Sequence, residues 1–143
     1  MCMAIALTGC ATSMIGGRAV DTSIQSPNQD SRVRYLITHF TQLDFGNSVR
    51  VLTDGKSERR VSSHYLVGIN PPTIHRLVDE GRRAWHAGVS RWKLDDDLNS
   101  GSIGVEIVNP GHDGGLPPYP DAQIEAVIAL CKDICARRNI APE

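Results

Sequence analysis

The stretch Ser102–Val108, with the sequence SIGVEIV, decides the predicted fold. Ile103, Val105 and Ile107 alternate with other residues, and this period of two is typical of a β-strand with one apolar face. The opposite face of the strand carries Glu106. That glutamate either faces solvent from an exposed sheet face or lies on the wall of a partly dry cleft, where a raised pKa would suit a general base.

A second strand is predicted upstream. Val33, Tyr35 and Ile37 alternate with other residues, and the strand is expected to end at His39. A strand end is a rigid position from which a side chain can project into a cleft, so His39 is a candidate ligand or catalytic group. The alternative is a partly buried histidine whose hydrogen bonds are satisfied within the fold.

The segments between these two strands predict further regular structure. We expect a short helix over residues 44–52 and a strand over 63–68, and a pair of prolines then separates this strand from a hairpin partner over 73–78. Residues 81–100 show no clear period and predict a structured loop.

A long helix is predicted near the end of the sequence, with Asp121 as its cap and its last turn near Asn139. The side chains expected to face the sheet are Ile124, Val127, Ile128, Cys131, Ile134 and Cys135. Together the elements predict an α/β domain with a mixed sheet and one long helix packed on it.

The composition limits the class of protein. The chain has 143 residues, a length that allows one domain and hardly two. Apolar residues make up 41% and charged residues 22%, which argues against intrinsic disorder. The net charge of -1 gives no basic excess, so we expect no nucleic-acid partner.

The N-terminal segment suggests an export and anchoring signal. A short apolar run, Met3–Leu7, leads into Thr8-Gly9-Cys10, which resembles a bacterial lipoprotein signal with Cys10 as the lipidated residue. The alternatives are a frayed apolar N-terminus or a first strand. The polar segment Ala11–Ser31 then reads as a flexible tether, so residues 1–31 are interpreted as signal and tether and residues 32–143 as the folded domain.

Five short motifs occur in order along the folded part. They are Ile37–Thr41 (ITHFT), Val61–Val67 (VSSHYLV), Arg83–Ser90 (RAWHAGVS), Ser102–Ile107 (SIGVEI) and Tyr119–Gln123 (YPDAQ). In order and wording they resemble the zinc-dependent N-acetylmuramoyl-L-alanine amidases of the type-2 class, relatives of the peptidoglycan recognition proteins, and in particular their lipoprotein branch. The resemblance covers about residues 32–143.

This resemblance implies a central mixed β-sheet flanked by helices, with one zinc ion in a surface groove. The implied reaction is hydrolysis of the amide between N-acetylmuramic acid and L-alanine in peptidoglycan or muropeptides, in cell-wall catabolism and remodelling. His39 would be a zinc ligand and Glu106 the general base for a zinc-bound water. His64 and His86 would face the groove and bind substrate, or else serve as hydrogen-bonded scaffolding without substrate contact.

The resemblance also shows a departure. The family carries its second zinc histidine, an assisting lysine and an aspartate ligand after the long helix, where this sequence reaches Glu143. We therefore expect the domain to be incomplete at its C-terminus and the 143-residue form to be inactive. The alternative function is a non-catalytic peptidoglycan-binding lipoprotein. The expected location is the periplasmic face of the outer membrane, reached through a lipid on Cys10, or otherwise the periplasm.

Overall fold

The computed structural model describes residues 13–141, which divide into two units at the boundary between Asp30 and Ser31. In the first unit, β1 (Ser13–Ile15) pairs antiparallel with β2 (Arg18–Val20). Gly16 and Gly17 connect them with φ of 57° and 77°, which a two-residue hairpin turn of this kind requires. This hairpin was not predicted within the tether, because its strands are short and exposed. Cys10, the predicted lipid site, lies outside the described residues.

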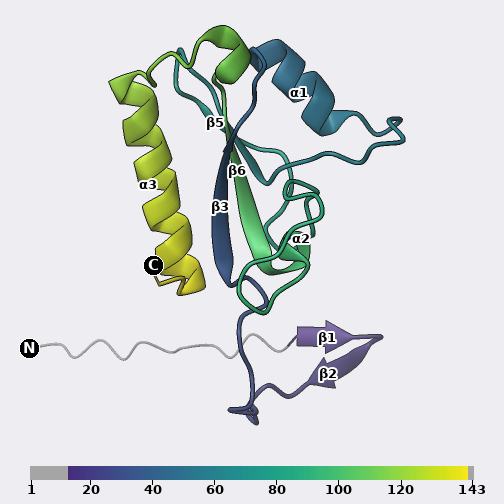
Figure 1. The fold of residues 1–143 in the computed structure, drawn as a ribbon. Coiled ribbons are helices and arrows are strands. Elements are labelled where there is room, and N and C mark those ends of the chain that lie inside the picture. Colours follow the sequence, from purple (N-terminus) through teal and green to yellow (C-terminus); the bar gives the residue numbers. More distant parts are fainter. Residues whose placement is uncertain (1–12, 142–143) are drawn as a thin grey trace, which may run out of the picture. The chain divides into compact units, whose positions relative to one another are not determined.

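The second unit contains a four-stranded mixed sheet in the order β3-β6-β4-β5 (Figure 1). Its strands are β3 (Tyr35–Phe40), β6 (Ser102–Ile107), β4 (Tyr65–Val67) and β5 (Ile74–Arg76). The first three are mutually parallel, and β5 closes an antiparallel hairpin on β4. The predicted strands and the predicted hairpin are therefore confirmed, with SIGVEI in the interior of the sheet.

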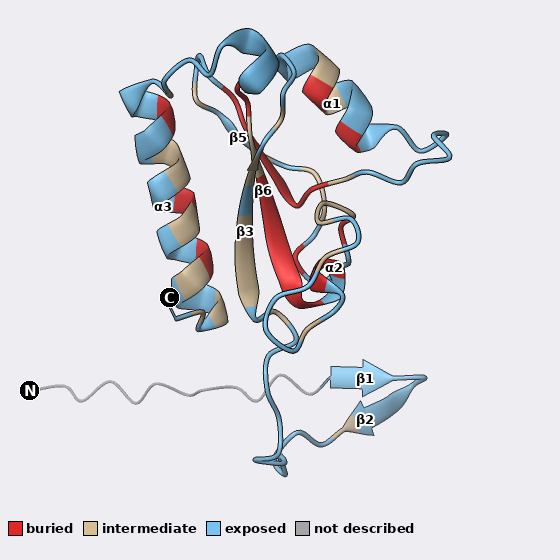
Figure 2. Cartoon of the chain, viewed as in Figure 1, coloured by how far each residue is buried: buried red, intermediate tan, exposed pale blue. Residues whose placement is uncertain are grey.

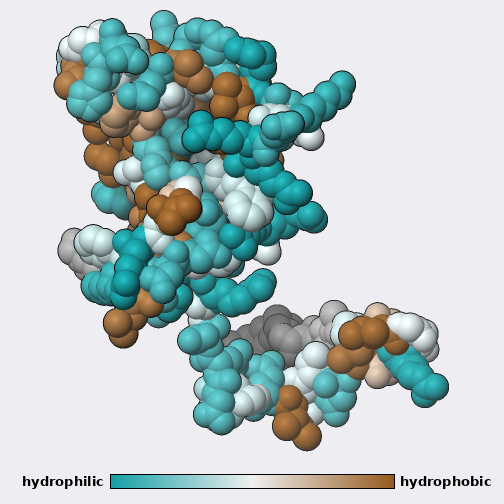
Figure 3. Space-filling model, turned by 45° about the vertical axis from the view of Figure 1, so that its right-hand side comes forward, coloured by the Kyte–Doolittle hydropathy of each residue, from teal (hydrophilic) through white to brown (hydrophobic). Residues whose placement is uncertain are grey.

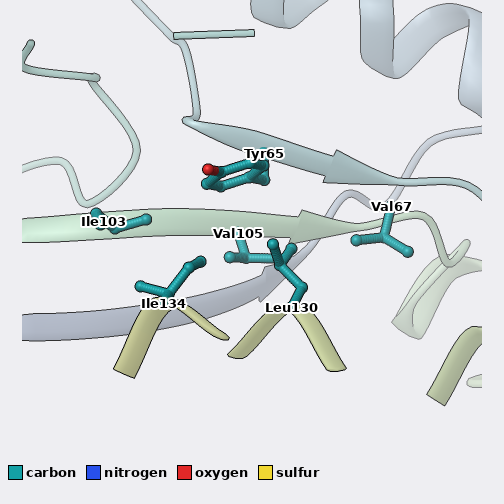
Figure 4. Close-up of a cluster of buried hydrophobic side chains, with 6 residues drawn as sticks. All are labelled: Tyr65, Val67, Ile103, Val105, Leu130 and Ile134. Carbon is teal, nitrogen blue, oxygen red and sulfur yellow. The ribbon is translucent and has the colours of Figure 1, made fainter. Parts of the chain in front are cut away.

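One face of the sheet packs against α3 (Asp121–Arg138). Figure 2 shows the buried residues of α3 along the side that faces the sheet. The core between the two layers consists of Tyr65, Val67, Ile103, Val105, Leu130 and Ile134 (Figure 4). The apolar residues of SIGVEI thus bury their side chains under the helix, and this layer is the larger hydrophobic core of the unit.

The buried face of α3 differs from the predicted stripe. Ile134 is buried as expected, but Ile124 and Ile128 are 42% and 47% exposed, while Gln123 and Leu130 are buried. The predicted stripe is therefore right for Val127 and Ile134, which pack in the core, and wrong for Ile124 and Ile128. Gln123 donates from Nε2 to the backbone carbonyls of Val67 and Val108, at 3.4 and 2.9 Å, and these bonds satisfy its buried amide nitrogen.

The beginning of α3 differs in detail from the prediction, whereas its end near Asn139 is confirmed. Asp121 is the first helical residue and not the cap; Pro120 precedes it and makes no side-chain capping bond. A carboxylate in the first turn still interacts favourably with the helix dipole. Asn139 ends the helix in the left-handed region with φ of 54°, and its N–H donates to the carbonyl of Cys135.

Helix α1 (Phe45–Thr53) packs on part of the opposite face of the sheet. Asp44 caps this helix by accepting a 2.9 Å hydrogen bond from the N–H of Asn47, so the predicted short helix is confirmed. A second core cluster forms there from Leu52, Leu66 and Val108, with Val49 and Leu77 packed against it. Helices therefore flank the mixed sheet on both sides, as expected.

The predicted loop over residues 81–100 is confirmed as largely irregular, and it leads into the short helix α2 (Leu98–Gly101). A one-turn helix, η1 (His112–Gly114), lies between β6 and α3. No helix of the described residues is both long and apolar enough to span a membrane. Hydrophilic side chains dominate the face seen in Figure 3, with apolar side chains between them.

A buried carboxylate fastens the end of α3 to the rest of the unit. Glu80 is 7% exposed and accepts two hydrogen bonds of 2.9 Å from Arg137, one of 2.8 Å from Arg138 and one of 2.6 Å from the Tyr65 hydroxyl. These donors, Arg137 first, lower the pKa of Glu80 to about 2. The carboxylate is therefore ionised and fully paired at neutral pH.

Candidate active site

Strand register brings the two principal candidate residues together. His39 and Glu106 are direct Cα partners in the parallel pair β3–β6. Because side chains alternate between the faces of a sheet and paired residues share a face, both lie on the side away from α3. The residues that sequence analysis named as ligand and base are therefore neighbours on one face.

Glu106 borders a small cavity on this face. The cavity has a volume of about 90 Å³, and its other walls include Thr41, Leu43, Leu52 and Val61. Glu106 is half-buried, and no hydrogen bond or ion pair joins its carboxyl group to any other residue between 13 and 141. Burial alone raises its pKa to about 7. Of the two alternatives for Glu106, a solvated sheet face or a partly dry cleft wall, its half-buried position beside this cavity corresponds to the second.

A larger groove adjoins this cavity. It has a volume of about 580 Å³ and shares Leu52 and Val61 with the cavity beside Glu106. Its walls include Arg60 and Trp85, and the guanidinium of Arg60 lies 5.9 Å from the centre of the Trp85 ring. The groove therefore adjoins the cavity beside the candidate base and carries an aromatic ring and a cation on its wall.

His39 is half-buried, and this burial lowers its pKa below the ordinary value. Its Nε2 lies 3.1 Å from Nδ1 of His86. Within the described part of the chain its Nδ1 makes no hydrogen bond. An imidazole with one nitrogen hydrogen-bonded and the other free is in the state that metal ligation requires.

His86 lies between His39 and the beginning of β6. Its Nε2 is 3.2 Å from the Ser102 hydroxyl, which itself donates to the Leu98 carbonyl at 2.5 Å. Burial, followed by the neighbouring His39 and His64, lowers the pKa of His86 to about 4, so it is neutral at pH 7. The structure thus places His86 against His39, where its ring nitrogens are occupied by protein partners.

His64 is fully buried, and its two ring nitrogens have backbone partners. The N–H of Gly104 donates to Nδ1 at 3.0 Å, so the ring proton lies on Nε2, which donates to the Arg82 carbonyl at 3.1 Å. Burial also lowers its pKa. His64 therefore has no free nitrogen and no exposed surface for a substrate, and its role in this structure is to join β4 to β6 and to the loop.

Sequence analysis missed three residues that build this site. Asn99 accepts from the N–H groups of His86 and Ala87, both at 2.9 Å, and so fixes the loop that carries His86. Ser102 binds the His86 ring, and Gly104 leaves the space in which that ring lies. The sequence contained a signal for Ser102 and Gly104, because they precede Glu106 at spacings of two and therefore share its face of the strand.

The described residues supply one good metal donor but not a complete metal site. His39 offers the free Nδ1, which suits zinc. Among residues 13–141, however, no group of three or more His, Cys, Asp or Glu side chains is arranged to hold a metal ion. The donor set described here therefore does not by itself form the three-ligand site that the resemblance implies.

Comparisons with known proteins identify the family of this chain. Residues 29–143 match the family described as N-acetylmuramoyl-L-alanine amidase. The N-acetylmuramoyl-L-alanine amidase AmiD of Escherichia coli K12 is 40% identical over 155 residues, which cover 98% of this chain and 55% of AmiD. The chain thus spans about half the length of this relative.

Solved structures show the same fold. AmiD of E. coli in complex with anhydro-N-acetylmuramic acid-L-Ala-D-γ-Glu-L-Lys matches with a TM-score of 0.79 and 40% identity, covering 92% of this chain and 54% of AmiD. AmpDh3 of Pseudomonas aeruginosa with anhydromuramic pentapeptide matches with a TM-score of 0.74 and 39% identity, covering 84% and 52%. The family match, the sequence identity and the shared fold lead to one assignment: the chain belongs to the N-acetylmuramoyl-L-alanine amidase family.

Proposed function

We propose that this protein hydrolyses the amide bond between N-acetylmuramic acid and L-alanine in peptidoglycan or its muropeptides. The observation that carries the proposal is Glu106, whose pKa is raised to about 7 beside His39 on a half-buried sheet face. A general base works best when its pKa lies near the operating pH. The similarity to AmiD and AmpDh3, whose structures contain anhydromuramic peptides, supports muropeptides as the substrate class.

Glu106 is the proton carrier in the proposed reaction. Its carboxylate takes a proton from a water molecule while the water oxygen bonds to the carbonyl carbon of the lactyl group. The carboxyl group then gives this proton to the nitrogen of L-alanine as the carbon–nitrogen bond breaks. The products are the carboxylate of the muramic acid and a stem peptide with a free amino group.

Zinc is the proposed cofactor, on the strength of the family and the chemistry of His39. The free Nδ1 of His39 would supply one ligand, and the bound metal would lower the pKa of a water molecule to about 7. Since the described residues hold no further clustered donors, the proton steps above are assigned to Glu106 alone.

The test is muropeptide hydrolysis by the protein as its cell produces it, with peptide release followed by chromatography and mass spectrometry. We expect release of L-alanine-terminated stem peptide, its loss with a metal chelator, and a loss of at least about 100-fold in Glu106→Gln, the low end for a general base. Glu125→Gln, an exposed glutamate of α3, is the matched control. A zinc-loaded protein that cleaves no muropeptide, or a Glu106→Gln variant with unchanged turnover, would contradict the proposal.

The alternative of a non-catalytic peptidoglycan binder gives no role to a carboxyl group with a pKa near 7. In the same assay that alternative predicts retained muropeptides without released peptide.

We further propose a lipid anchor on Cys10 that holds the domain at the periplasmic face of the outer membrane. The support is the lipoprotein-like sequence Leu7-Thr8-Gly9-Cys10 and the polar segment that follows it. Metabolic labelling with a radioactive fatty acid should mark the protein, and Cys10→Ser should remove the label. Label that persists in Cys10→Ser would refute this anchor.

A further inference from the structure

We propose that His86 is a positioning residue for His39, holding the imidazole so that Nε2–H points into the fold and Nδ1 points to the site. Ser102 fixes the direction of this hydrogen-bond chain, and Gly104 makes room for it. The consequence for zinc rests on the proposed function, whereas the hydrogen bond between the two rings does not.

The direction of the chain follows from counting protons. The single hydroxyl proton of Ser102 is donated to the Leu98 carbonyl, so its oxygen accepts from His86. The proton of neutral His86 therefore lies on Nε2, and its Nδ1 is an acceptor. Because His39 approaches that Nδ1 with its own Nε2, His39 must be the donor. Each partner in the chain then has one consistent role.

The position of His86 is fixed sterically as well as by hydrogen bonds. A Cβ added at Gly104 would lie 2.3 Å from Cγ of His86, far inside contact distance, so the ring packs flat on a strand position that only glycine leaves open. Asn99 holds the backbone of the same loop through the N–H groups of His86 and Ala87. The ring therefore cannot move toward the sheet, and the loop that carries it is fastened on its other side.

The arrangement matches how ligating histidines are held elsewhere. A metal-binding imidazole usually donates its second N–H to a neighbouring acceptor, and loss of that acceptor costs about 10–100-fold in metal affinity. Here the acceptor is a neutral imidazole, which is itself fixed by the Ser102 hydroxyl. His86 thus orients His39 without contributing a ligand.

The decisive measurement needs neither metal nor substrate. In the uniformly ¹⁵N-labelled 143-residue chain, an N–H···N hydrogen bond transmits a scalar coupling between the two nitrogens. We expect a resolved coupling between His39 Nε2 and His86 Nδ1, with the proton assigned to His39. Absence of the coupling, or a proton on His86 Nδ1, would overturn the proposal.

Substitutions separate hydrogen bonding from packing. His86→Phe keeps a ring but has no acceptor, whereas His86→Gln offers both an oxygen acceptor and an N–H donor. Relaxation of the His39 ring should show a rigid ring in the parent chain and in His86→Gln, and a mobile ring in His86→Phe. His75→Phe, a histidine of β5 that contacts Phe45, is the control and should change nothing at His39. Equal rigidity in the Phe and Gln variants would contradict the positioning role.

Zinc titration read at the His39 resonances then links the two proposals. We expect the apparent affinity to fall about 10-fold in His86→Phe and to recover in His86→Gln. A zinc affinity that is unchanged in His86→Phe would overturn the role of His86 toward the metal. Zinc that never perturbs His39 in the parent chain would contradict the proposed zinc function, while the N–N coupling would still decide the hydrogen bond.

Discussion

Replacement of Glu106 by glutamine should stabilise the fold while it removes the proposed base. The carboxyl group is half-buried, borders a small cavity and has no hydrogen-bond or ion-pair partner among residues 13–141. Ionisation in that place is unfavourable, and this is the physical cause of its raised pKa. A neutral amide of nearly the same shape avoids the cost of ionisation.

The size and pH dependence of this effect follow from the shift in pKa. Each pKa unit corresponds to about 1.4 kcal/mol, so the change from 4.5 to about 7 sets an upper bound of about 3 kcal/mol. Between these two pH values the folded state of the parent chain binds more protons than the unfolded state, so its stability falls as the pH rises. Partial solvent contact reduces the effect, and we expect about 2 kcal/mol above pH 7.

Urea unfolding of the 143-residue chain and of Glu106→Gln at several pH values measures this difference. At pH 4 the two should be equally stable. At pH 8 the unfolding midpoint of the variant should be higher by about 1 M, given a urea dependence of about 1–3 kcal/mol per molar for small domains. Glu125→Gln should stay within about 0.5 kcal/mol throughout. A pH-independent difference, or a variant less stable at pH 8, would show that burial does not control this carboxyl group.

Three further substitutions test the packing. Glu80→Gln should lower the free energy of unfolding by about 3 kcal/mol at pH 7, because it removes a buried, paired carboxylate. Since the pKa of Glu80 in the folded state is lowered to about 2, this loss of stability should be complete above pH 4.5 and should vanish as the pH falls to 2. Gly104→Ala should displace the His86 ring, cost about 1–3 kcal/mol and abolish the N–N coupling. Ile134→Ala should lower the free energy of unfolding by about 2–5 kcal/mol. It should leave the NMR-measured pKa of Glu106 unchanged, because Ile134 packs on the face of the sheet opposite to Glu106.

Much of the fold could be predicted because alternating residues and a capping residue mark where its strands and helices lie. Alternation defines β3 and β6, and the Asp44 cap begins α1 where the spacing predicts. The burial of Gln123 on α3 could not be predicted from apolar residues, since it depends on two backbone carbonyls, of Val67 and Val108, that accept from its amide. That requirement exists in the assembled sheet and leaves no mark on the helix sequence.

The candidate site also has a part that could be predicted from the sequence and a part that could not. His39 and Glu106 were predicted individually, but their shared face depends on a register between strands more than sixty residues apart. The environment of His64 could not be read from sequence, because its partners are backbone groups of Gly104 and Arg82. The motifs singled out His86, which the structure places against His39, but not the side chains of Asn99 and Ser102 that hold it.

The strand SIGVEI explains why stability and site chemistry can be separated in this fold. Ile103, Val105 and Ile107 pack their apolar side chains under α3, and this burial stabilises the fold. The alternate positions each serve the other face: Ser102 orients His86, Gly104 gives that ring its place, and Glu106 occupies the dry wall beside His39. A shift of one residue in register would exchange the two sets and destroy both layers at once. The apolar half of the strand therefore protects the site chemistry by fixing the register, although it contacts none of the reacting groups.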